Sequence, residues 1–389
     1  MNQPLRILAV DVGTGTQDIL LFESDKTIEN CFQLIMPSPT VIMAERIKRA
    51  SARSSTLVLT GHTMGGGPCA WAARDHALAG LPVFATPDAA RTFDDDLTMV
   101  AQMGVQVVDE QEAASLAMRH NTVQLDLKDF DPVALATALR AFDIDPAIDA
   151  LAIAVFDHGA APPGVSDRLF RFNYIAQTVQ QRPEPAAFAY LRETLPADLT
   201  RLQAVAQSAA AYQRFVDTAP SAQGMAESAQ PLPLLLMDTG SAAVLGTLDD
   251  PRVRRERESV LVNMGNFHTL AFHLIDGRIA GLFEHHTGLL EQAKLEGLLR
   301  KLVAGILTNA EVFDDSGHGA LVLGNTQSGA FPFLAVTGPR RQMLLGSALR
   351  PYPAVPHGSM MLAGCFGLLR AFADRQPDFA GAINPLLDN

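Results

Sequence analysis

Two stretches of this chain share a pattern that few folds can accommodate: an apolar strand enters a glycine turn and leaves it as a second apolar strand. Residues 8–23 read LAVDVGTGTQDILLFE, with alternating glycine and threonine in the turn. Residues 258–288 read ESVLVNMGNFHTLAFHLIDGRIAGLFEHHTG and add an Asp-Gly hairpin turn and a third strand. A strand at 27–36 and a helix at 38–51 follow the first stretch, and 288–307 has helical periodicity after the second. The sequence therefore predicts an α/β architecture built twice, with three strands and then a helix in each half.

The length of 389 residues is sufficient for two domains that each bury a core of their own. We expect the first domain to span residues 1–231 and the second to span residues 232–389. A short apolar run at 55–61 predicts a further buried strand of the first domain. Alternating helical and strand-like pieces over about 68–145 predict an α/β insertion in that domain, and residues 176–216 predict a helical segment.

Composition excludes several classes of partner. The formal net charge of −12 argues against nucleic acid or an anionic membrane as the main partner, although a local basic site for a small anion stays possible in principle. No window reaches the roughly 18 apolar residues of a membrane span, and a strand-like run begins too soon after Met1 for a signal peptide. Cys31, Cys69 and Cys365 are far apart in the sequence and form no CxxC pair. We therefore expect buried free thiols and a cytoplasmic protein.

The turn at residues 13–16 has the chemistry of a phosphate site. Glycine lets a phosphate approach backbone N–H groups closely, and threonine hydroxyls can add hydrogen bonds to its oxygens. Asp11, at the end of the preceding strand, can hold Mg²⁺ through water. The alternative is a tight hairpin that needs glycine for its backbone and threonine for its β propensity. On its own, the turn slightly favours this structural alternative.

Five segments in a fixed order resemble motifs of the actin, Hsp70 and sugar-kinase superfamily. Residues 9–22 (AVDVGTGTQDILLF) resemble its first phosphate motif and residues 260–281 (VLVNMGNFHTLAFHLIDGRIAG) its second. Residues 333–344 (FLAVTGPRRQML) resemble its adenosine motif. The Ala/Gly-rich segments 237–248 and 357–372 resemble the two helices that cross at its hinge. Within the superfamily the chain is similar to an uncharacterised branch sometimes labelled pyruvate formate-lyase-activating.

This resemblance implies an α/β fold of two ribonuclease-H-like (actin-like ATPase) domains with a central nucleotide cleft that binds ATP and Mg²⁺. Asp11 would be the metal ligand and a catalytic residue. The phosphates would meet Asp11, Gly13, Thr14, Gly15 and Thr16 from one side and Gly265, Asn266, His268 and Thr269 from the other, while Gly338, Pro339 and Arg340 would lie near the nucleoside.

The chain departs from the superfamily pattern at three places. Asn263 occupies a position that usually carries aspartate, and an amide cannot replace a carboxylate as metal anchor or base. The second turn reads Asn-Phe-His rather than a glycine-rich sequence, and Gly338-Pro339 stands where two glycines are usual. These departures favour nucleotide binding over turnover. The sequence also lacks the three closely spaced cysteines that hold the cluster required for activation of pyruvate formate-lyase.

A second glycine-rich stretch, TGHTMGGGP at 60–68, follows the strand at 55–61. Gly65, Gly66 and Gly67 leave backbone N–H groups open before a helix that begins at proline, which is typical of an anion site. We interpret these glycines and His62 as substrate contacts, because ligands of open α/β sheets bind beyond the carboxyl ends of the strands. The structural alternative is a flexible connection into the insertion.

Residues 155–168, VFDHGAAPPGVSDR, follow another predicted strand. Asp157 is a candidate general base for an acceptor hydroxyl, and His158 beside it is a candidate substrate contact. The alternative, which we favour, is that Asp157 accepts hydrogen bonds from the N–H groups of its own turn.

Five histidines lie at strand ends or glycine turns: His62, His158, His268, His285 and His286. Imidazoles combined with Asp157 or Glu284 would suit a metal site. No recognised ligand spacing is present, so we interpret them as polar loop residues and phosphate contacts.

The sequence thus favours a Mg-ATP-binding cleft protein, either a small-molecule phosphotransferase (a kinase) or an ATP-dependent switch. The alternative is a nucleotide-regulated partner-binding protein or scaffold with little or no ATPase activity. Neither the small-molecule acceptor nor the partner protein is identified by the sequence.

Overall fold

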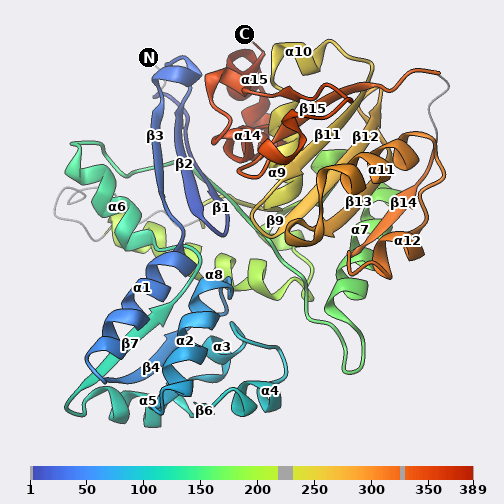
Figure 1. Ribbon diagram of the computed structural model, residues 1–389. Coiled ribbons are helices and arrows are strands. Elements are labelled where there is room, and N and C mark those ends of the chain that lie inside the picture. Colours follow the sequence, from blue (N-terminus) through green and yellow to red (C-terminus); the bar gives the residue numbers. More distant parts are fainter. Residues whose placement is uncertain (1–2, 218–230, 325–328, 389) are drawn as a thin grey trace.

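The computed structural model describes residues 3–217, 231–324 and 329–388. Two six-stranded sheets form the body of the molecule, and a smaller four-stranded sheet lies apart from them (Figure 1). In spatial order the first sheet consists of β3 (Phe32–Pro37), β2 (Thr16–Glu23), β1 (Arg6–Val12), β8 (Ala150–Val155), β10 (Leu234–Asp238) and β9 (Ala189–Leu191). The second consists of β14 (Gly319–Val322), β13 (Arg278–His286), β12 (His268–Ile275), β11 (Glu258–Met264), β15 (Phe333–Thr337) and β16 (Tyr352–Pro353).

Both large sheets have the same core topology. In each, three consecutive antiparallel strands (β1–β3 and β11–β13) are extended by two parallel strands beside the first of them: β8 and β10 in one sheet, β15 and β16 in the other. This repeated strand order is the ribonuclease-H-like arrangement, so the predicted fold of two actin-like domains is confirmed. The central strands are apolar runs because both of their faces are covered; β8, for example, is buried along its whole length.

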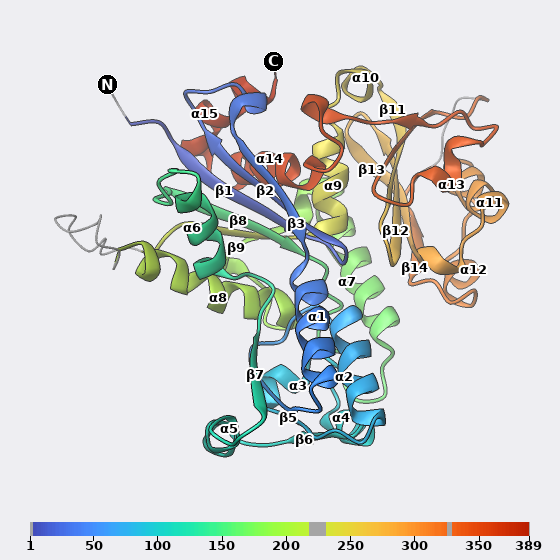
Figure 2. The same ribbon diagram turned by 60° about the vertical axis from the view of Figure 1, so that its left-hand side comes forward.

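The four-stranded sheet is the α/β insertion. It contains β6 (Val105–Val107), β5 (Val83–Ala85), β4 (Thr56–Gly61) and β7 (Thr122–Leu127), all parallel. Its helices are α1 (Pro39–Ala52), α2 (Pro68–Leu78), α3 (Pro87–Ala90), α4 (Leu97–Gln102) and α5 (Glu110–Ala117). In Figure 2 this unit extends from the edge of the first domain as a separate layer. The strand at 55–61 was expected in the first domain outside the insertion, and the insertion was expected to begin near residue 68. Both expectations are corrected here, because β4 pairs with β5 and β7 and the insertion starts directly after β3.

Further helices lie around the two large sheets. In the first domain α8 (Thr200–Asp217) contacts β8 and β10, and α6 (Pro132–Ala141) packs on α8. The second sheet is contacted by α7 (Asp167–Gln181), α11 (Gln292–Val303) and α12 (Asn309–Phe313), and the second domain also contains the short helices α10 (Pro251–Arg254) and α13 (Gln342–Leu345). The expected boundary at 231/232 adjoins residues 218–230, which lie outside the described residues. Since β10 pairs with β8, this strand belongs to the first sheet and not to the second domain.

Helices α9 (Thr239–Thr247) and α14 (Ala363–Arg375) pack against each other between the sheets, and α15 (Pro377–Leu387) follows. A Cβ added at Gly246 would lie 1.8 Å from the carbonyl oxygen of Ala363, and one added at Gly367 would lie 1.9 Å from that of Ala242. The backbones therefore touch, which is the close approach that the small residues of these segments predict. The second helix begins at Ala363, later than the expected residue 357.

Two further observations bear on the environment of the chain. Cys31, Cys69 and Cys365 are free and buried, as predicted. Of the helices in the part of the chain that the structure describes, none has the length and apolar character needed to cross a membrane.

Candidate functional site

A cavity of about 620 Å³ lies where the two domains and the insertion meet. This volume is within the roughly 300–1,000 Å³ usual for small-molecule sites. Its lining comes from both hairpin turns, from the glycine loop 65–67, from residues 156–159 after β8, and from the start of α14. Most of the residues predicted for the site line it: Asp11, Gly13, Thr14, Gly15, Thr16, Gly65, Gly66, Gly67, Asp157, His158, Gly265, Asn266, His268, Gly338 and Pro339.

The first hairpin turn places two carboxylates in this cavity. Gly13 N–H donates to the carbonyl of Thr16 at 2.9 Å, and this bond closes the turn. Asp11 and Asp18 are directly paired across β1 and β2, so their side chains share one face of the hairpin. Burial, with the nearby charge of Asp18, raises the pKa of Asp11 to about 8, and burial raises the pKa of Asp18 to about 7.

These carboxylates fit a hydrated Mg²⁺ ion. Asp11 Oδ1 accepts a hydrogen bond from Thr239 Oγ1 at 2.5 Å, but the buried Oδ1 of Asp18 has no hydrogen-bond partner among the described residues. A cation would satisfy the unpartnered oxygen and stabilise the charged forms of both side chains, which burial disfavours. Asp18 was not predicted, although an aspartate directly before the apolar run ILLF of the same strand was a signal that could have found it.

The second hairpin turn faces the first. Gly265 N–H donates to the carbonyl of His268 at 2.9 Å, the same closing bond. A Cβ added at Gly15 would lie 2.9 Å from Asn266 Nδ2, so the two turns are in contact across the cleft. Of the four residues predicted here, Thr269 does not reach the cavity: it is buried, and its hydroxyl bonds to that of Thr287 at 2.9 Å. It points away because side chains alternate along β12.

The glycine loop 65–67 contacts both turns. A Cβ added at Gly67 would lie 3.0 Å from the ring of Phe267 and 3.8 Å from the methyl group of Thr14. The N–H of Gly65 already donates to Asp129 Oδ1 at 3.1 Å, so it is not free for an anion. Trp71, on α2, packs edge-on against Phe267 with 5.6 Å between ring centroids. The insertion and the second domain thus meet at this aromatic pair, which no pattern in the sequence predicted.

Two other predicted contacts lie outside the cavity lining. His62 continues β4, where its N–H donates to the carbonyl of Leu127 at 2.8 Å. Arg340 is exposed, and its N–H donates to the carbonyl of Met264 at 3.0 Å. The turn after β15 therefore presents Gly338 and Pro339 to the cavity but directs Arg340 to solvent.

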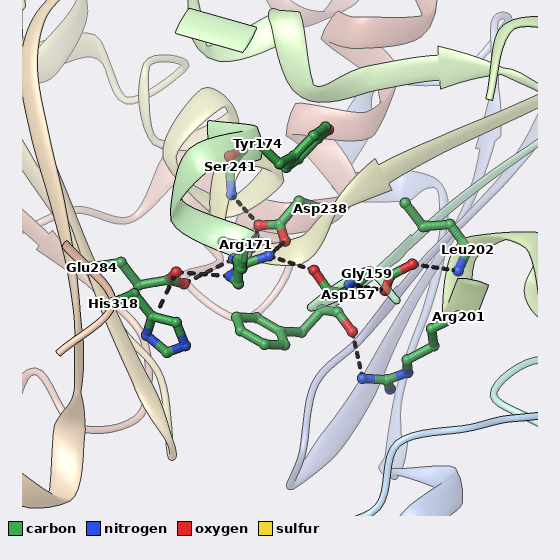
Figure 3. A network of polar contacts seen from close by, with 12 residues as sticks. Asp157, Gly159, Arg171, Tyr174, Arg201, Leu202, Asp238, Ser241, Glu284 and His318 are labelled. Carbon is green, nitrogen blue, oxygen red and sulfur yellow. Dashed lines mark hydrogen bonds and ion pairs between the residues drawn. The ribbon is translucent and has the colours of Figure 1, made fainter. Parts of the chain in front are cut away.

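Asp157 is part of a buried polar network (Figure 3). Its Oδ1 accepts from Gly159 N–H and its Oδ2 from Leu202 N–H, both at 2.8 Å. Burial raises its pKa, and these two hydrogen bonds oppose the rise. The contacts match the alternative favoured from the sequence, in which Asp157 holds the backbone of its turn. Its role as a general base stays a prediction.

Arg171, which the sequence did not single out, joins the two sheets. From α7 it donates to both oxygens of Glu284 at 2.7 and 2.8 Å, to Asp238 Oδ2 at 2.9 Å and to the carbonyl of Asp157 at 2.7 Å. Asp238 ends β10 of the first sheet and Glu284 lies in β13 of the second. Only 1% of Arg171 is exposed, so this is a fully desolvated ion network between the domains.

The cavity is rich in negative charge. Its lining includes the carboxylates of Asp11, Asp18, Asp94, Asp95, Asp157, Asp167 and Glu284 and the guanidinium groups of Arg91 and Arg201. Arg201 is committed to Asp129 by two hydrogen bonds of 2.6 and 2.9 Å. Acidic side chains therefore outnumber basic ones in the lining of this cavity.

Three solved structures illustrate how distant the structural similarities are. A polyphosphate/ATP-glucomannokinase from Arthrobacter sp. strain KM matches 96% of this chain and 100% of its own, at 12% identity and a TM-score of 0.33. The ethanolamine utilization protein EutJ from Carboxydothermus hydrogenoformans matches 94% and 90%, at 11% identity and 0.31. A ROK-family transcriptional regulator, described as a homologue of an Escherichia coli protein, matches 71% of this chain at 10% identity and 0.25, and the chain spans only 38% of its length.

No curated protein matches the chain by sequence. A family model does match, over residues 64–343, which is more than half of the chain. The model is described as "Putative pyruvate format-lyase activating enzyme (DUF1786)". Its match covers the glycine loop 65–67, the second hairpin turn, and β15 with Gly338 after it. The chain belongs to the DUF1786 family.

Proposed function

We propose that the cleft binds Mg-ATP, with the phosphates held between the turns at 13–16 and 265–268. The observation that carries this proposal is the meeting of two hairpin turns with the same closing hydrogen bond, one from each sheet, at a single cavity. Backbone N–H groups of glycine turns are suited to phosphate oxygens because no side chain blocks their approach.

Magnesium is integral to the proposed ligand because of the charge of the cavity. Free ATP would bring further negative charge beside Asp11 and Asp18, and the charge of Asp18 already raises the pKa of Asp11. A hydrated Mg²⁺ between these carboxylates and the phosphates would reverse the local repulsion. We therefore expect ATP without a divalent cation to bind weakly.

The nucleoside would lie toward the ends of β11 and β15. Asn263, Thr337, Gly338 and Pro339 line the cavity there. Gly338 has a φ of +92°, and a Cβ at this position would lie 2.5 Å from the carbonyl oxygen of Met264. Glycine therefore lets the turn after β15 pack closely against the end of β11.

Beyond the phosphate turns, the cavity continues to Trp71, Arg91, Phe93 and His158. In a phosphotransferase this space would hold the small-molecule acceptor. In an ATP-dependent switch it would close without transfer, since the insertion already contacts the second domain through Trp71 and Phe267. The second version is our alternative, and the two hydrogen bonds that occupy Asp157 favour it.

The test of nucleotide binding is a thermal shift with Mg-ATP, a non-hydrolysable analogue with Mg²⁺, and ATP with a chelator. Saturating ligand at about 100 times Kd should stabilise the protein by about 2.7 kcal/mol, and the chelator should remove the effect. Asp11→Ala should abolish the shift, whereas Asp378→Asn, an exposed carboxylate on α15, should leave it unchanged. A shift that persists in Asp11→Ala would contradict the phosphate assignment.

Turnover separates the two versions. Phosphate release should be measured with and without candidate acceptors, in the wild type and in Asp157→Asn. Acceptor-dependent transfer that this variant loses would support the phosphotransferase. Slow, acceptor-free hydrolysis that the variant retains would support the switch.

A further inference from the structure

Three histidines that are far apart in the sequence meet beside the cavity. His158 follows β8 of the first sheet, His268 begins β12, and His318 precedes β14 of the second. Each offers a ring nitrogen, and the three atoms lie within 4.8 Å of one another. His158 and His268 line the cavity, while His318 lies behind them and is fully buried. The cluster therefore spans the boundary between the two domains.

His318 is the member whose environment most demands a ligand. Both of its ring nitrogens are buried and without a hydrogen-bond partner among the described residues. Other buried histidines differ: His76 bonds to Ser51 Oγ at 2.8 Å, and His273 bonds to Glu258 Oε1 at 2.9 Å. An unsatisfied buried polar group costs about 1–3 kcal/mol, so a fully unpartnered imidazole calls for a missing partner.

The surrounding charges also suit a cation, although Arg171 lies close by. The guanidinium of Arg171 is paired with two buried carboxylates, those of Asp238 and Glu284, so the group as a whole is anionic. A Glu284 oxygen lies 3.8 Å from His318 Nδ1 (Figure 3). This distance is too long for a hydrogen bond, but a small rotation of the ring would bring Nδ1 to the carboxylate and leave the other nitrogen for a metal.

We propose that His158, His268 and His318 form a binding site for a divalent transition metal of the Zn²⁺ type. Imidazole ligands suit zinc and its neighbours, whereas Mg²⁺ prefers oxygen. Nitrogens bound to one tetrahedral Zn²⁺ at about 2.0–2.1 Å would lie about 3.3 Å apart, so small ring rotations would bring this cluster onto the ion.

The site would keep one coordination position open to the cavity, because two of its three ligands line that cavity. Three protein ligands and an open position are typical of catalytic rather than structural zinc. Its ligands come from both domains, so the metal would also link them next to the turn at 265–268. This inference concerns metal binding and does not depend on the nucleotide proposal.

The test is a titration of chelator-stripped, tag-free protein with Zn²⁺, and separately with Co²⁺, in the absence of nucleotide. Removal of any affinity tag is essential because a polyhistidine tag binds the same ions. We expect about one ion per chain and a visible Co²⁺ absorption band of imidazole coordination. His158→Asn, which alters a side chain facing the cavity, should weaken Zn²⁺ binding by about 100-fold or more. His318→Ala should do the same.

The control is His120→Asn, which changes an exposed histidine outside the cluster and should bind metal like the wild type. Circular dichroism of each variant checks that the fold is retained. Two results would overturn the proposal: no saturable binding at micromolar Zn²⁺, or wild-type binding by the folded His158→Asn variant. Metal binding without any Mg-ATP shift would support this site while contradicting the nucleotide proposal.

Discussion

The two hairpin turns that face the cavity have the same backbone and different chemistry. Both are closed by a bond from a glycine N–H to the carbonyl three residues later, at 2.9 Å in each case. In the first hairpin, Asp11 lies opposite Asp18 on the neighbouring strand. At the equivalent positions of the second hairpin, Asn263 lies opposite Leu270. One hairpin therefore carries two carboxylates where its counterpart carries none.

The difference shows how a duplicated fold can divide its tasks. The first turn has small residues and buried acids, which suit a cation and its bound phosphates. The second has Phe267, which packs on Trp71, and His268, whose ring stacks on Phe156 with 4.0 Å between centroids. It supplies contacts to the insertion and to the histidine cluster.

The largest expected effect comes from the residue that holds the two hairpins opposite each other. Arg171→Met keeps an apolar stem but leaves Glu284 and Asp238 as unpaired buried charges, which should cost about 3–5 kcal/mol of unfolding free energy. Urea denaturation measures this. The control is Arg257→Met, which breaks an ion pair whose side chains are 85% and 53% exposed, and the expected cost is at most about 1 kcal/mol. Equal losses in the two variants would show that Arg171 does not fix the domains.

The sequence predicted the duplicated fold and the two turns because these depend on local patterns. An apolar run, a glycine turn and another apolar run define a hairpin wherever they occur, and the spacing from Asp11 to Gly13 places the acid beside the turn. The hinge contact was likewise readable from small residues in 237–248.

Features assembled from distant segments could not be predicted in this way. Arg171 on α7 and His318 before β14 acquire their partners only when the sheets pack, and no local spacing marks either residue. The same limit applies to β4, because an apolar pattern predicts a buried strand but not the strands with which it pairs. Thr269 was predicted because it lies in a recognised motif. The alternation of side chains along β12 would have excluded it from the cavity.

The second prediction concerns the pH dependence of the carboxylate hairpin. The pKa values of Asp11 and Asp18 are raised to about 8 and about 7, so the folded state binds protons that the unfolded state releases near pH 3.8. This contribution to stability is fully present below pH 3.8 and is lost as the pH rises to about 8. Asp11→Asn can still accept the Thr239 hydrogen bond but does not titrate. The variant therefore lacks the part of this stability loss that comes from Asp11.

Asp11→Asn should therefore gain stability relative to the wild type as the pH rises from 5 to 8, without Mg²⁺ or nucleotide. Each pKa unit corresponds to about 1.4 kcal/mol, so the difference should reach a few kcal/mol. Thermal melts at several pH values measure it. The stability difference between Asp378→Asn and the wild type should stay constant with pH. If the stability difference between Asp11→Asn and the wild type is also constant, the hairpin acids titrate normally.

A third prediction asks whether both acids serve the cation. Asp18→Asn removes the negative charge of this carboxylate and should raise the Mg²⁺ concentration needed for half of the ATP-induced thermal shift, by about 10-fold (about 1.4 kcal/mol). Asn263→Ala, at the position equivalent to Asp11 in the other hairpin, should change the Mg²⁺ requirement little. If Asn263→Ala has the larger effect, the division of tasks between the hairpins is reversed.

The smallest expected effect tests the aromatic contact of the second turn. Trp71 is the one tryptophan of the sequence and is 52% exposed, so its fluorescence reports directly on its contact with Phe267. Edge-on aromatic pairs contribute about 0.5–1.5 kcal/mol, and Phe267→Leu should lower stability by an amount in that range.

If ligands close the insertion onto the second domain, Mg-ATP should change the Trp71 emission in the wild type and less in Phe267→Leu. Phe142→Leu, which alters an exposed aromatic residue away from the cavity, is the control. An equal Mg-ATP response in wild type and Phe267→Leu would mean that the second turn does not couple the ligand to the insertion, and its sequence would then need another explanation.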